Sequence, residues 1–375
     1  MKKTLSLVSL FVFLMSCSMV EQTLDTPDRK HTFQKKDEFR IAWSRNLDPV
    51  YDTGNFPIAL NSPNVHKGIL FVGTGDGFLE AFELENGRPI WKIKENGHFH
   101  QKPIFHKDTI IYGTVEGRVV ARHYLSGKLK YKVDLDTAIE SPGVIAGGRL
   151  FFQLRNHKVF SLDAETGKIL WAYRRSVPYL TTIQRVSTPL VVGKKLYVGF
   201  ADANIVCFNV EDGSLVWERK LSRGLKFVDV DASPVLFRNR LITGSMDGKV
   251  SILNPKNGVV LRTLDFAISR APVIHEGKLY FGTTDGRLIR FEADLTTSKE
   301  LSVSKRALGD IAFTKELLYL ATLDGRLLEV DPSSLSVKRT HEFGHDQSAI
   351  FGDLVSFDDK LALLSSRYRL YILDL

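Results

Sequence analysis

A tryptophan-centred phrase recurs along this chain and constrains what the chain can fold into. One apolar run ends at Gly73 and continues through a glycine-bearing turn to Trp91. A second apolar run ends at Gly199 and continues through a similar turn to Trp217, with the same order of features. One supersecondary unit is therefore repeated along the chain.

The repeat has a period typical of propeller blades. Aligning the second residue of each central turn gives Gly77, Gly117, His157, Asn204, Gly248, Gly286, Gly325 and Tyr368, which are 38 to 47 residues apart. A period of about forty residues, with every segment patterned as strand, is typical of a β-propeller and not of a helical solenoid. Each unit supplies a strand after a proline, an apolar strand, a third strand and an outer strand. We predict an all-β chain whose blades each have four antiparallel strands.

Turn residues support this division. Asp76-Gly77 and Asp285-Gly286 fit two-residue hairpins of the favoured hand, because Gly, Asn and Asp tolerate positive φ at least cost. A second glycine-bearing hairpin follows in five units, and four residues beyond its glycine stand Trp91, Tyr131, Trp171, Trp217 and Arg262. An aromatic side chain at one place on successive outer strands would wedge neighbouring blades together. Arg262 breaks the series, so its blade is expected to dock differently.

The end of the chain supplies only three strands of an eighth unit, near residues 349–351, 361–365 and 370–373. A missing outer strand would leave an open sheet edge. Residues 39–47 resemble the outer strands, with Trp43 in the place of Trp91. We therefore predict an eight-bladed β-propeller whose last blade is closed by the N-terminal strand. The alternative is a seven-bladed ring with a loose N-terminal strand and an irregular tail.

The N-terminus has the order of a secretory signal. Lys2 and Lys3 precede an apolar stretch over residues 5–15, and Ser16-Cys17 follows. Residues 14–17 also resemble the bacterial lipoprotein box, and this resemblance implies cleavage before Cys17 and attachment of lipid, such as palmitate, to its thiol. The alternative, an ordinary secretory signal, would leave an unpaired thiol. Ser18 is not the aspartate used for inner-membrane retention, which implies an outer-membrane address.

These features predict three regions. Residues 1–16 are the expected signal peptide, residues 17–37 a polar, flexible tether, and residues 38–375 a single propeller domain. The anchor would hold the propeller at the membrane surface without inserting it. Cys207 is the only other cysteine and is expected to be a small buried side chain, which excludes disulfide and cysteine-rich metal chemistry.

Charge and motifs point away from nucleic acids and catalysis. The formal net charge is +8, but the basic residues are scattered along the repeat and do not cluster with aromatic residues. The chain contains no G-x-S-x-G elbow, HExxH, P-loop or C-x-x-C motif. The histidines and turn aspartates recur by blade, which indicates turn structure and not ligands. We expect no catalytic residues, no metal site and no cofactor.

The repeat is similar to that of quinoprotein dehydrogenases, which bind pyrroloquinoline quinone at the centre of an eight-bladed ring. Residues 161–171, Ser-Leu-Asp-Ala-Glu-Thr-Gly-Lys-Ile-Leu-Trp, carry this resemblance. Those enzymes often have an adjacent cysteine pair and an acidic calcium site. This chain has no Cys-Cys pair. The resemblance therefore implies a shared scaffold, and a site has to be argued separately.

Signal, tether and uninterrupted repeats together resemble the BamB family, the propeller lipoproteins of the outer-membrane β-barrel assembly (BAM) machine. Two loops sharpen the resemblance. Residues 178–189 follow the family's Pro-x-Leu-x-Leu-Arg-Gly-x-Ser-x-Pro pattern, with Gln184 inserted and Val186 in place of the glycine. Residues 229–234 follow its Asp-Val-Asp-x-x-Pro pattern. In that family these loops lie at the surface that contacts the barrel-forming subunit.

Carried over residue by residue, the resemblance nominates Leu180, Thr182, Ile183, Arg185, Asp229 and Asp231 for partner binding. Exposed aliphatic side chains at a loop tip would provide an apolar anchor, and a rim of arginine and carboxylates would provide charge complementarity. The alternative is structural: the prolines and Ser187 shape the start of a strand, and Asp229 and Asp231 satisfy loop amides.

The function expected from this resemblance is that of a non-enzymatic scaffold lipoprotein on the periplasmic face of the outer membrane. It would bind the periplasmic domains of the BamA-like, barrel-forming subunit and assist insertion of nascent outer membrane proteins. Two alternatives stay open, a binding module of another envelope complex and a quinone-dependent dehydrogenase.

Overall fold

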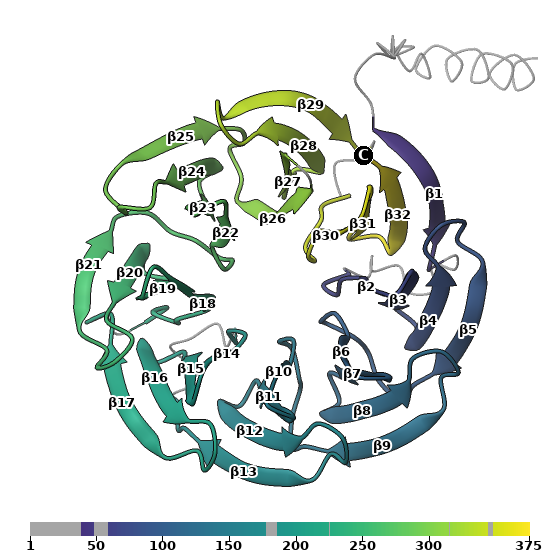
Figure 1. Ribbon diagram of the computed structural model, residues 1–375, viewed down its shortest axis with the longest axis horizontal. Coiled ribbons are helices and arrows are strands. Elements are labelled where there is room, and N and C mark those ends of the chain that lie inside the picture. Colours follow the sequence, from purple (N-terminus) through teal and green to yellow (C-terminus); the bar gives the residue numbers. More distant parts are fainter. Residues whose placement is uncertain (1–38, 49–58, 178–185, 225, 315, 344–347) are drawn as a thin grey trace, which may run out of the picture. The chain divides into compact units, whose positions relative to one another are not determined.

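A computed structural model describes residues 39–48, 59–177, 186–224, 226–314, 316–343 and 348–375. These residues form eight sheets, each of four strands, arranged around a ring (Figure 1). All strand pairs within the sheets are antiparallel. The predicted eight-bladed propeller is confirmed, and the seven-bladed alternative is wrong.

The blades are numbered 1 to 8 from β2 onward, and the strands run from the ring centre outward. The innermost strands are β2 (Asn64–His66), β6 (Ile104–His106), β10 (Val144–Ala146), β14 (Leu190–Val192), β18 (Ala232–Phe237), β22 (Val273–His275), β26 (Leu308–Thr314) and β30 (Val355–Phe357). The second strands are β3 (Ile69–Gly73), β7 (Thr109–Gly113), β11 (Arg149–Gln153), β15 (Lys195–Gly199), β19 (Arg240–Ser245), β23 (Lys278–Gly282), β27 (Leu317–Thr322) and β31 (Lys360–Leu364).

The third strands are β4 (Phe78–Glu83), β8 (Arg118–His123), β12 (Lys158–Asp163), β16 (Asn204–Asn209), β20 (Lys249–Leu253), β24 (Arg287–Phe291), β28 (Arg326–Asp331) and β32 (Arg369–Asp374). The outer strands are β5 (Pro89–Lys94), β9 (Leu129–Asp134), β13 (Ile169–Arg174), β17 (Leu215–Lys220), β21 (Val260–Leu264), β25 (Ser298–Ser302), β29 (Ser336–Glu342) and β1 (Arg40–Asn46). The second and third strands are almost fully buried, whereas the outer strands are largely exposed.

The N-terminal strand closes the ring as predicted. Strand β1 pairs antiparallel with β32, and Trp43 lies opposite Ile372. The first strand of this last blade is Val355–Phe357, so the prediction at residues 349–351 was wrong. Residues 349–351 are an apolar run in a connecting segment, where burial against other blades demands the same residue types as a strand.

The central turns are longer than the two residues expected. In blade 1, residues 74–77 connect β3 to β4, and only Gly77 has positive φ there, at 82°. The Gly77 amide donates to the Thr74 carbonyl (3.2 Å), and the Thr74 hydroxyl donates to the Asp76 carboxylate. Asp76 thus serves the turn as a hydrogen-bond acceptor, while the glycine supplies the left-handed residue. In blade 4 this conformation falls on Ala203 (φ 70°) and not on Asn204, a shift of one residue from the alignment.

One hydrogen bond recurs between neighbouring blades. The indole nitrogen of Trp43 donates to the Leu84 carbonyl (2.8 Å), and Trp91 donates in the same way to Tyr124 (3.0 Å). Equivalent donors and acceptors are Tyr131 to Ala164, Trp171 to Val210 and Trp217 to Pro255. Arg262 docks its blade differently, as expected, because its guanidinium donates to the Leu295 carbonyl, two residues beyond Ala293, which is the residue that corresponds to Leu84.

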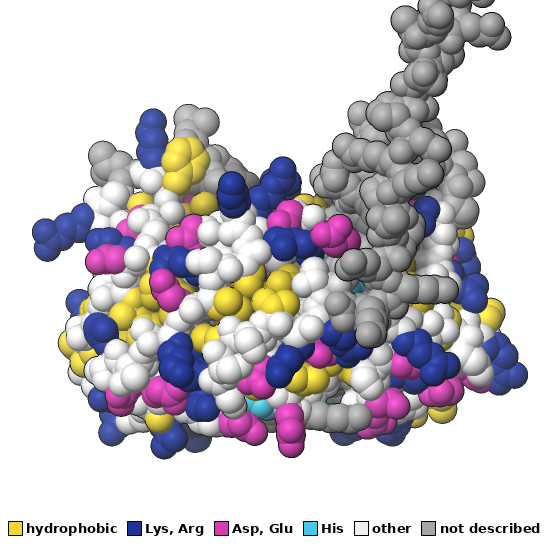
Figure 2. All heavy atoms as spheres, turned by 90° about the horizontal axis from the view of Figure 1, so that it is seen from above, with side chains coloured by type: hydrophobic (Ala, Val, Ile, Leu, Met, Phe, Trp, Pro, Cys, Tyr) yellow, Lys and Arg dark blue, Asp and Glu magenta, His cyan; other side chains and the backbone are white. Residues whose placement is uncertain are grey.

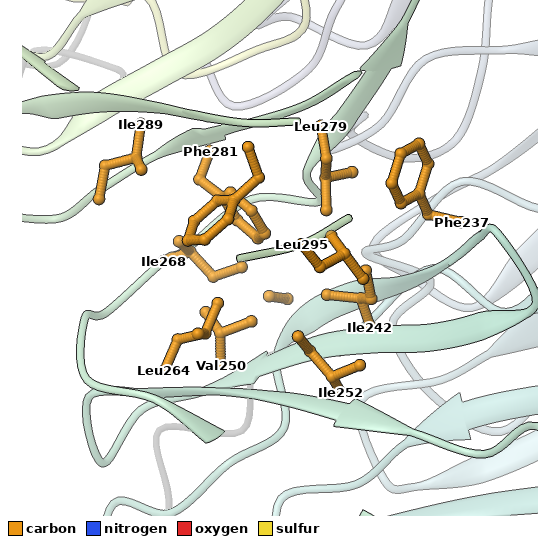
Figure 3. Close-up of a cluster of buried hydrophobic side chains, with 12 residues drawn as sticks. Phe237, Ile242, Val250, Ile252, Leu264, Ile268, Leu279, Phe281, Ile289 and Leu295 are labelled. Atoms are coloured by element: carbon orange, nitrogen blue, oxygen red, sulfur yellow. The ribbon is translucent and has the colours of Figure 1, made fainter. Parts of the chain in front are cut away.

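The core lies between the blades. The cluster in Figure 3 combines side chains from β18–β21 of blade 5, such as Ile242 and Val250, with side chains from blade 6, such as Leu279 and Phe281. Each sheet therefore buries both faces against its neighbours, which accounts for the continuous apolar runs in the second strands. Cys207 lies in such a cluster and is fully buried, as predicted.

The ring closure can be tested by removing a single donor. Trp43→Phe keeps most of the ring contact with Phe82 but leaves the Leu84 carbonyl without the indole donor. We expect a loss of about 1 kcal/mol in the free energy of unfolding and faster amide exchange in β1. Trp91→Phe is the matched control. It removes the same bond between blades 1 and 2, which follow each other in the chain, and should leave amide exchange in β1 unchanged. Equal exchange of β1 in the two variants would contradict a special role of Trp43 in closure.

Candidate partner-binding site

The two loops nominated above occupy equivalent places in neighbouring blades. The first connects outer strand β13 of blade 3 to β14 of blade 4, and the second connects β17 of blade 4 to β18 of blade 5. Each loop follows the outer strand of one blade and precedes the innermost strand of the next (Figure 1). They therefore share one side of the ring.

The first loop begins at a half-buried arginine that forms two ion pairs. The Arg175 guanidinium donates to the carboxylates of Asp202 (2.6 Å) and Glu218 (2.7 Å), both in blade 4. It also lies over the Phe200 ring. Burial alone would lower the pKa of Arg175, but its bonds to Glu218 and Asp202 outweigh burial and raise it. This arginine ties the end of blade 3 to blade 4 before the loop departs.

The first loop ends at a buried network. The Ser187 hydroxyl is fully buried; its oxygen accepts from the Gly199 amide (3.1 Å) and lies 3.2 Å from the Gln153 side-chain oxygen, to which it donates. The Gln153 amide also donates to the Gly199 carbonyl (2.8 Å). The Thr188 amide donates to the Ser233 hydroxyl (2.7 Å), which joins the first loop to the second. Ser187 therefore has the structural role that the alternative interpretation gave it.

The second loop buries its carboxylates. Asp229 and Asp231 are both buried, as are Val228 and Val230 between and beside them. The Val230 amide donates to the Phe200 carbonyl (3.0 Å), and the Met246 amide donates to the Asp229 carbonyl (2.9 Å). The two carboxylates thus lie inside the loop and do not form the exposed rim expected from the sequence.

The remaining nominated residues, Leu180, Thr182, Ile183 and Arg185, lie outside the described residues, as does Cys17. Their roles stay predictions. What the structure adds is the shape of both ends of the first loop and the whole backbone from Val228 to Pro234 in the second.

Two exposed apolar side chains at this site were missed by sequence reasoning. Phe227 is 52% exposed and has a φ of 53°, and Met246 is 37% exposed. Arg223 and Lys226, which precede Phe227 in the chain, and Lys249, which pairs with Ser245 beside Met246, are exposed too. The sequence carried little signal for Phe227, because the four residues after it are all buried and show no strand alternation that would set it apart. On the face shown in Figure 2, by comparison, small apolar groups are interleaved with charges of both signs.

A second cluster of charges crosses the ring centre. The Asp353 carboxylate accepts from Lys102 (2.8 Å) and from Arg270 (2.9 Å), which precede the innermost strands of blades 2 and 6. These blades stand opposite each other in an eight-bladed ring. The Asp310 carboxylate accepts from the Leu354 amide (2.9 Å). We call Lys102, Arg270, Asp310 and Asp353 the central ion cluster.

Electrostatics within this cluster are unequal. Burial, and then the charge of Asp353, raise the pKa of Asp310 to about 6. Burial would also raise the pKa of Asp353, but the charges of Lys102 and Arg270 outweigh it and lower that pKa. The cluster contains two cations and two carboxylates, so its charges balance. These groups pair with one another at the place where a propeller can hold a central ligand.

Other chemistry-bearing residues have structural surroundings. His66 stacks on Phe105 and His275 on Phe313, with ring centroids 4.4 and 3.8 Å apart. Burial raises the pKa of the Cys207 thiol to about 11, which disfavours the reactive thiolate. Across the described ranges, no group of three or more His, Cys, Asp or Glu side chains is placed to hold a metal. Among these same residues no helix has the length and apolarity needed to cross a membrane.

Comparison with known proteins decides the family. The sequence profile described as outer membrane protein assembly factor BamB matches residues 75–301, more than half of the chain. The chain belongs to the BamB family. A BamB from Yersinia pestis is 25% identical over 232 residues, which are 58% of this chain and 57% of that protein. The chain thus spans little more than half the length of this relative.

Two further likenesses place the BamB-family chain among propellers. The crystal structure of BamB from Moraxella catarrhalis superposes with a TM-score of 0.76 at 16% identity, covering 90% of this chain and all of that one. At this identity the likeness shows the shared fold. The quinoprotein alcohol dehydrogenase PedH of Pseudomonas putida is 30% identical over 129 residues, 32% of this chain and 21% of that enzyme. The sequence likeness to this enzyme is therefore confined to a part of each chain.

Proposed function

We propose that this BamB-family chain is a scaffold lipoprotein of the BAM complex with no catalytic activity of its own. Lipid on Cys17 holds it at the periplasmic face of the outer membrane. The ring binds the periplasmic domains of the barrel-forming subunit and assists insertion of outer membrane proteins. Family membership supports the complex, and the signal pattern before Cys17 supports the anchor.

One observation carries the proposed binding surface. The Thr188 amide, at the end of the first loop, donates to the Ser233 hydroxyl in β18, Ser187 accepts from the Gly199 amide, and the Val230 amide of the second loop donates to the Phe200 carbonyl. Backbone that is fixed in this way before binding loses little conformational freedom when it binds, which favours affinity. Asp229 and Asp231 are buried within the loop, so exposed neighbouring residues make the contact.

Photocrosslinking from the cell envelope tests this function. A photoreactive residue at Leu180 is expected to capture the barrel-forming subunit, and the same residue at Lys92, exposed on outer strand β5 of blade 1, is expected to capture none. Capture of a different envelope protein at Leu180 would instead support a module of another complex. Equal yields at both positions would remove the assignment.

The second candidate is a quinone-dependent dehydrogenase, favoured by the partial likeness to PedH. Against it stands the central ion cluster, in which Lys102 and Arg270 already neutralise Asp353 across the ring centre. Titrating the purified protein with pyrroloquinoline quinone and calcium separates the two functions. A scaffold shows the absorbance of the free quinone unchanged, whereas a dehydrogenase shifts it and reduces an artificial electron acceptor.

A further inference from the structure

Phe227 combines two features that are each unfavourable in a free protein. Its side chain is 52% exposed, and its backbone has a φ of 53°. A bulky residue rarely adopts this left-handed conformation, which usually falls to Gly or Asn. A sequence that keeps an aromatic side chain exposed and strained gives up stability at this position, and strain of this kind gathers at binding sites.

The conformation of Phe227 is fixed by the three residues after it. Val228 is buried, and the Val230 amide donates to the Phe200 carbonyl, so this segment is bound to blade 4. The Met246 amide donates to the Asp229 carbonyl, so the turn of blade 5 holds the loop from the other side. The Phe227 side chain is therefore presented by one fixed backbone conformation before any partner binds.

The surroundings of Phe227 define the chemistry of a partner. Met246, exposed beside the same loop, adds a flexible apolar side chain that adapts to a partner's surface. Arg223 and Lys226 are exposed just before Phe227 in the chain, Lys249 is exposed opposite Ser245 beside Met246, and Asp247 is the exposed acid of that turn. The local excess of positive charge fits an apolar pocket with an acidic rim.

We infer that Phe227, flanked by Met246, is an apolar anchor that inserts into an acidic-rimmed pocket of the periplasmic domains of the barrel-forming subunit. This inference rests on the proposed function and adds the residue and the pocket chemistry to it. A pre-organised aromatic side chain entering a pocket is the usual form of an interface hot spot. The basic side chains around it would guide encounter and contribute less to affinity.

Binding of the purified lipid-free protein to the purified periplasmic domains tests the anchor. Phe227→Ala is expected to bind about 30-fold more weakly, the loss typical of a truncated hot spot. Leu215→Ala is the matched control, because Leu215 is 54% exposed on outer strand β17 of the same region and should leave binding unchanged. Lys226→Gln should slow association at low salt and change dissociation little.

A second variant separates binding from folding. Phe227→Gly removes both the ring and the backbone strain, so we expect binding to fall as in Phe227→Ala while the melting temperature stays equal or rises. A fall in melting temperature together with binding would show that Phe227 is a structural residue and would overturn the inference.

The outcomes distinguish the inference from the proposed function. Capture of the subunit at Leu180 together with wild-type affinity of Phe227→Ala would overturn the anchor and leave the proposed function standing. No capture of the subunit at Leu180, together with no binding of the wild-type protein to the periplasmic domains, would overturn both the anchor and the proposed function. If Phe227→Ala bound the subunit normally and lost binding only to unfolded outer membrane proteins, the pocket assignment would be wrong, because the occupant would be an extended client.

Discussion

Gly199→Ala is expected to lower the free energy of unfolding by about 3 kcal/mol, the upper part of the range for overpacking a fixed site. Gly199 ends β15, where the second loop crosses it. A Cβ on Gly199 would lie 2.3 Å from the Val230 carbonyl oxygen and 2.8 Å from the Val230 Cγ1. The nearest atom belongs to the backbone, which cannot rotate away as a side chain can.

The same substitution should weaken partner binding. Val230 can move only if its amide leaves the Phe200 carbonyl, and that displacement shifts the segment that holds Phe227. Ser187 bonds to both the amide and the carbonyl of Gly199, so the end of the first loop would shift too. We therefore expect reduced binding even at temperatures where the variant stays folded.

Gly282→Ala is the matched control. Gly282 ends β23 at the equivalent place in blade 6, and its nearest new contact would be the Leu308 Cβ at 3.2 Å. A side-chain contact at this distance relaxes by small shifts, so we expect a loss of less than about 1 kcal/mol and unchanged binding. Chemical unfolding and binding titrations measure both quantities. Equal losses in the two variants would show that the contact with Val230 does not govern the effect.

Features with a local cause were predictable from the sequence. The left-handed residue at Gly77 is a property of one turn, and glycines at such turns mark the period. The closing strand was predictable because Trp43 repeats the outer-strand pattern, and the structure gives Trp43 the same bond that Trp91 makes. Because the unit repeats, the long-range pairing of β1 with β32 could be predicted by comparing residues 39–47 with the outer strands of the other blades.

Features defined by the assembled ring were not predictable in this way. The recurrent acceptor is a backbone carbonyl, which a long donor can replace with another carbonyl in reach, and so Arg262 bonds Leu295 where an aromatic donor would bond the residue that corresponds to Leu84. The Arg290 guanidinium reaches the Pro332 carbonyl at the next junction from a third strand. The sequence pattern shows that residue 262 has no aromatic side chain. Which carbonyl is bonded at a junction depends on the length of the donor side chain and on the position of its N–H groups.

The candidate site shows the same division. The resemblance nominated Asp229 and Asp231 but could not tell whether their carboxylates face solvent, because burial depends on the loop lying against blades 4 and 5. The central ion cluster had no signal at all. Lys102, Arg270 and Asp353 are far apart in sequence, stand outside the turn and strand patterns, and meet only because the ring closes.

Breaking the central ion cluster should have the second large effect. Asp353→Asn leaves Lys102 and Arg270 facing each other without a carboxylate between them. Removing one partner of a fully buried ion pair costs about 3 to 5 kcal/mol. The Asp353 side chain is 23% exposed, so water screens part of the charge, and we expect about 2 kcal/mol. Glu165→Gln, which breaks the exposed pair of Glu165 with Lys107, is the control and should change stability little.

The acid dependence of stability should separate Asp310 from Asp353. Burial and the charge of Asp353 raise the pKa of Asp310 to about 6 in the folded protein, against an ordinary value of 3.8. A raised pKa means that the folded state binds a proton more tightly than the unfolded chain. The Asp310 contribution to stability therefore increases as pH falls from 7 through 6 and is complete near pH 4.

Asp353 has the opposite sign, because Lys102 and Arg270 lower its pKa. Its stabilising contribution is present above its ordinary pKa and is lost as pH falls further. Asp310→Asn keeps an oxygen for the Leu354 amide but cannot titrate. The free energy of unfolding of the wild type minus that of this variant should rise by about 1 kcal/mol between pH 7 and pH 5, a difference in which groups that titrate alike in both proteins cancel. If this difference in the free energy of unfolding did not change with pH, the pKa of Asp310 would have its ordinary value, and burial beside Asp353 would not raise it.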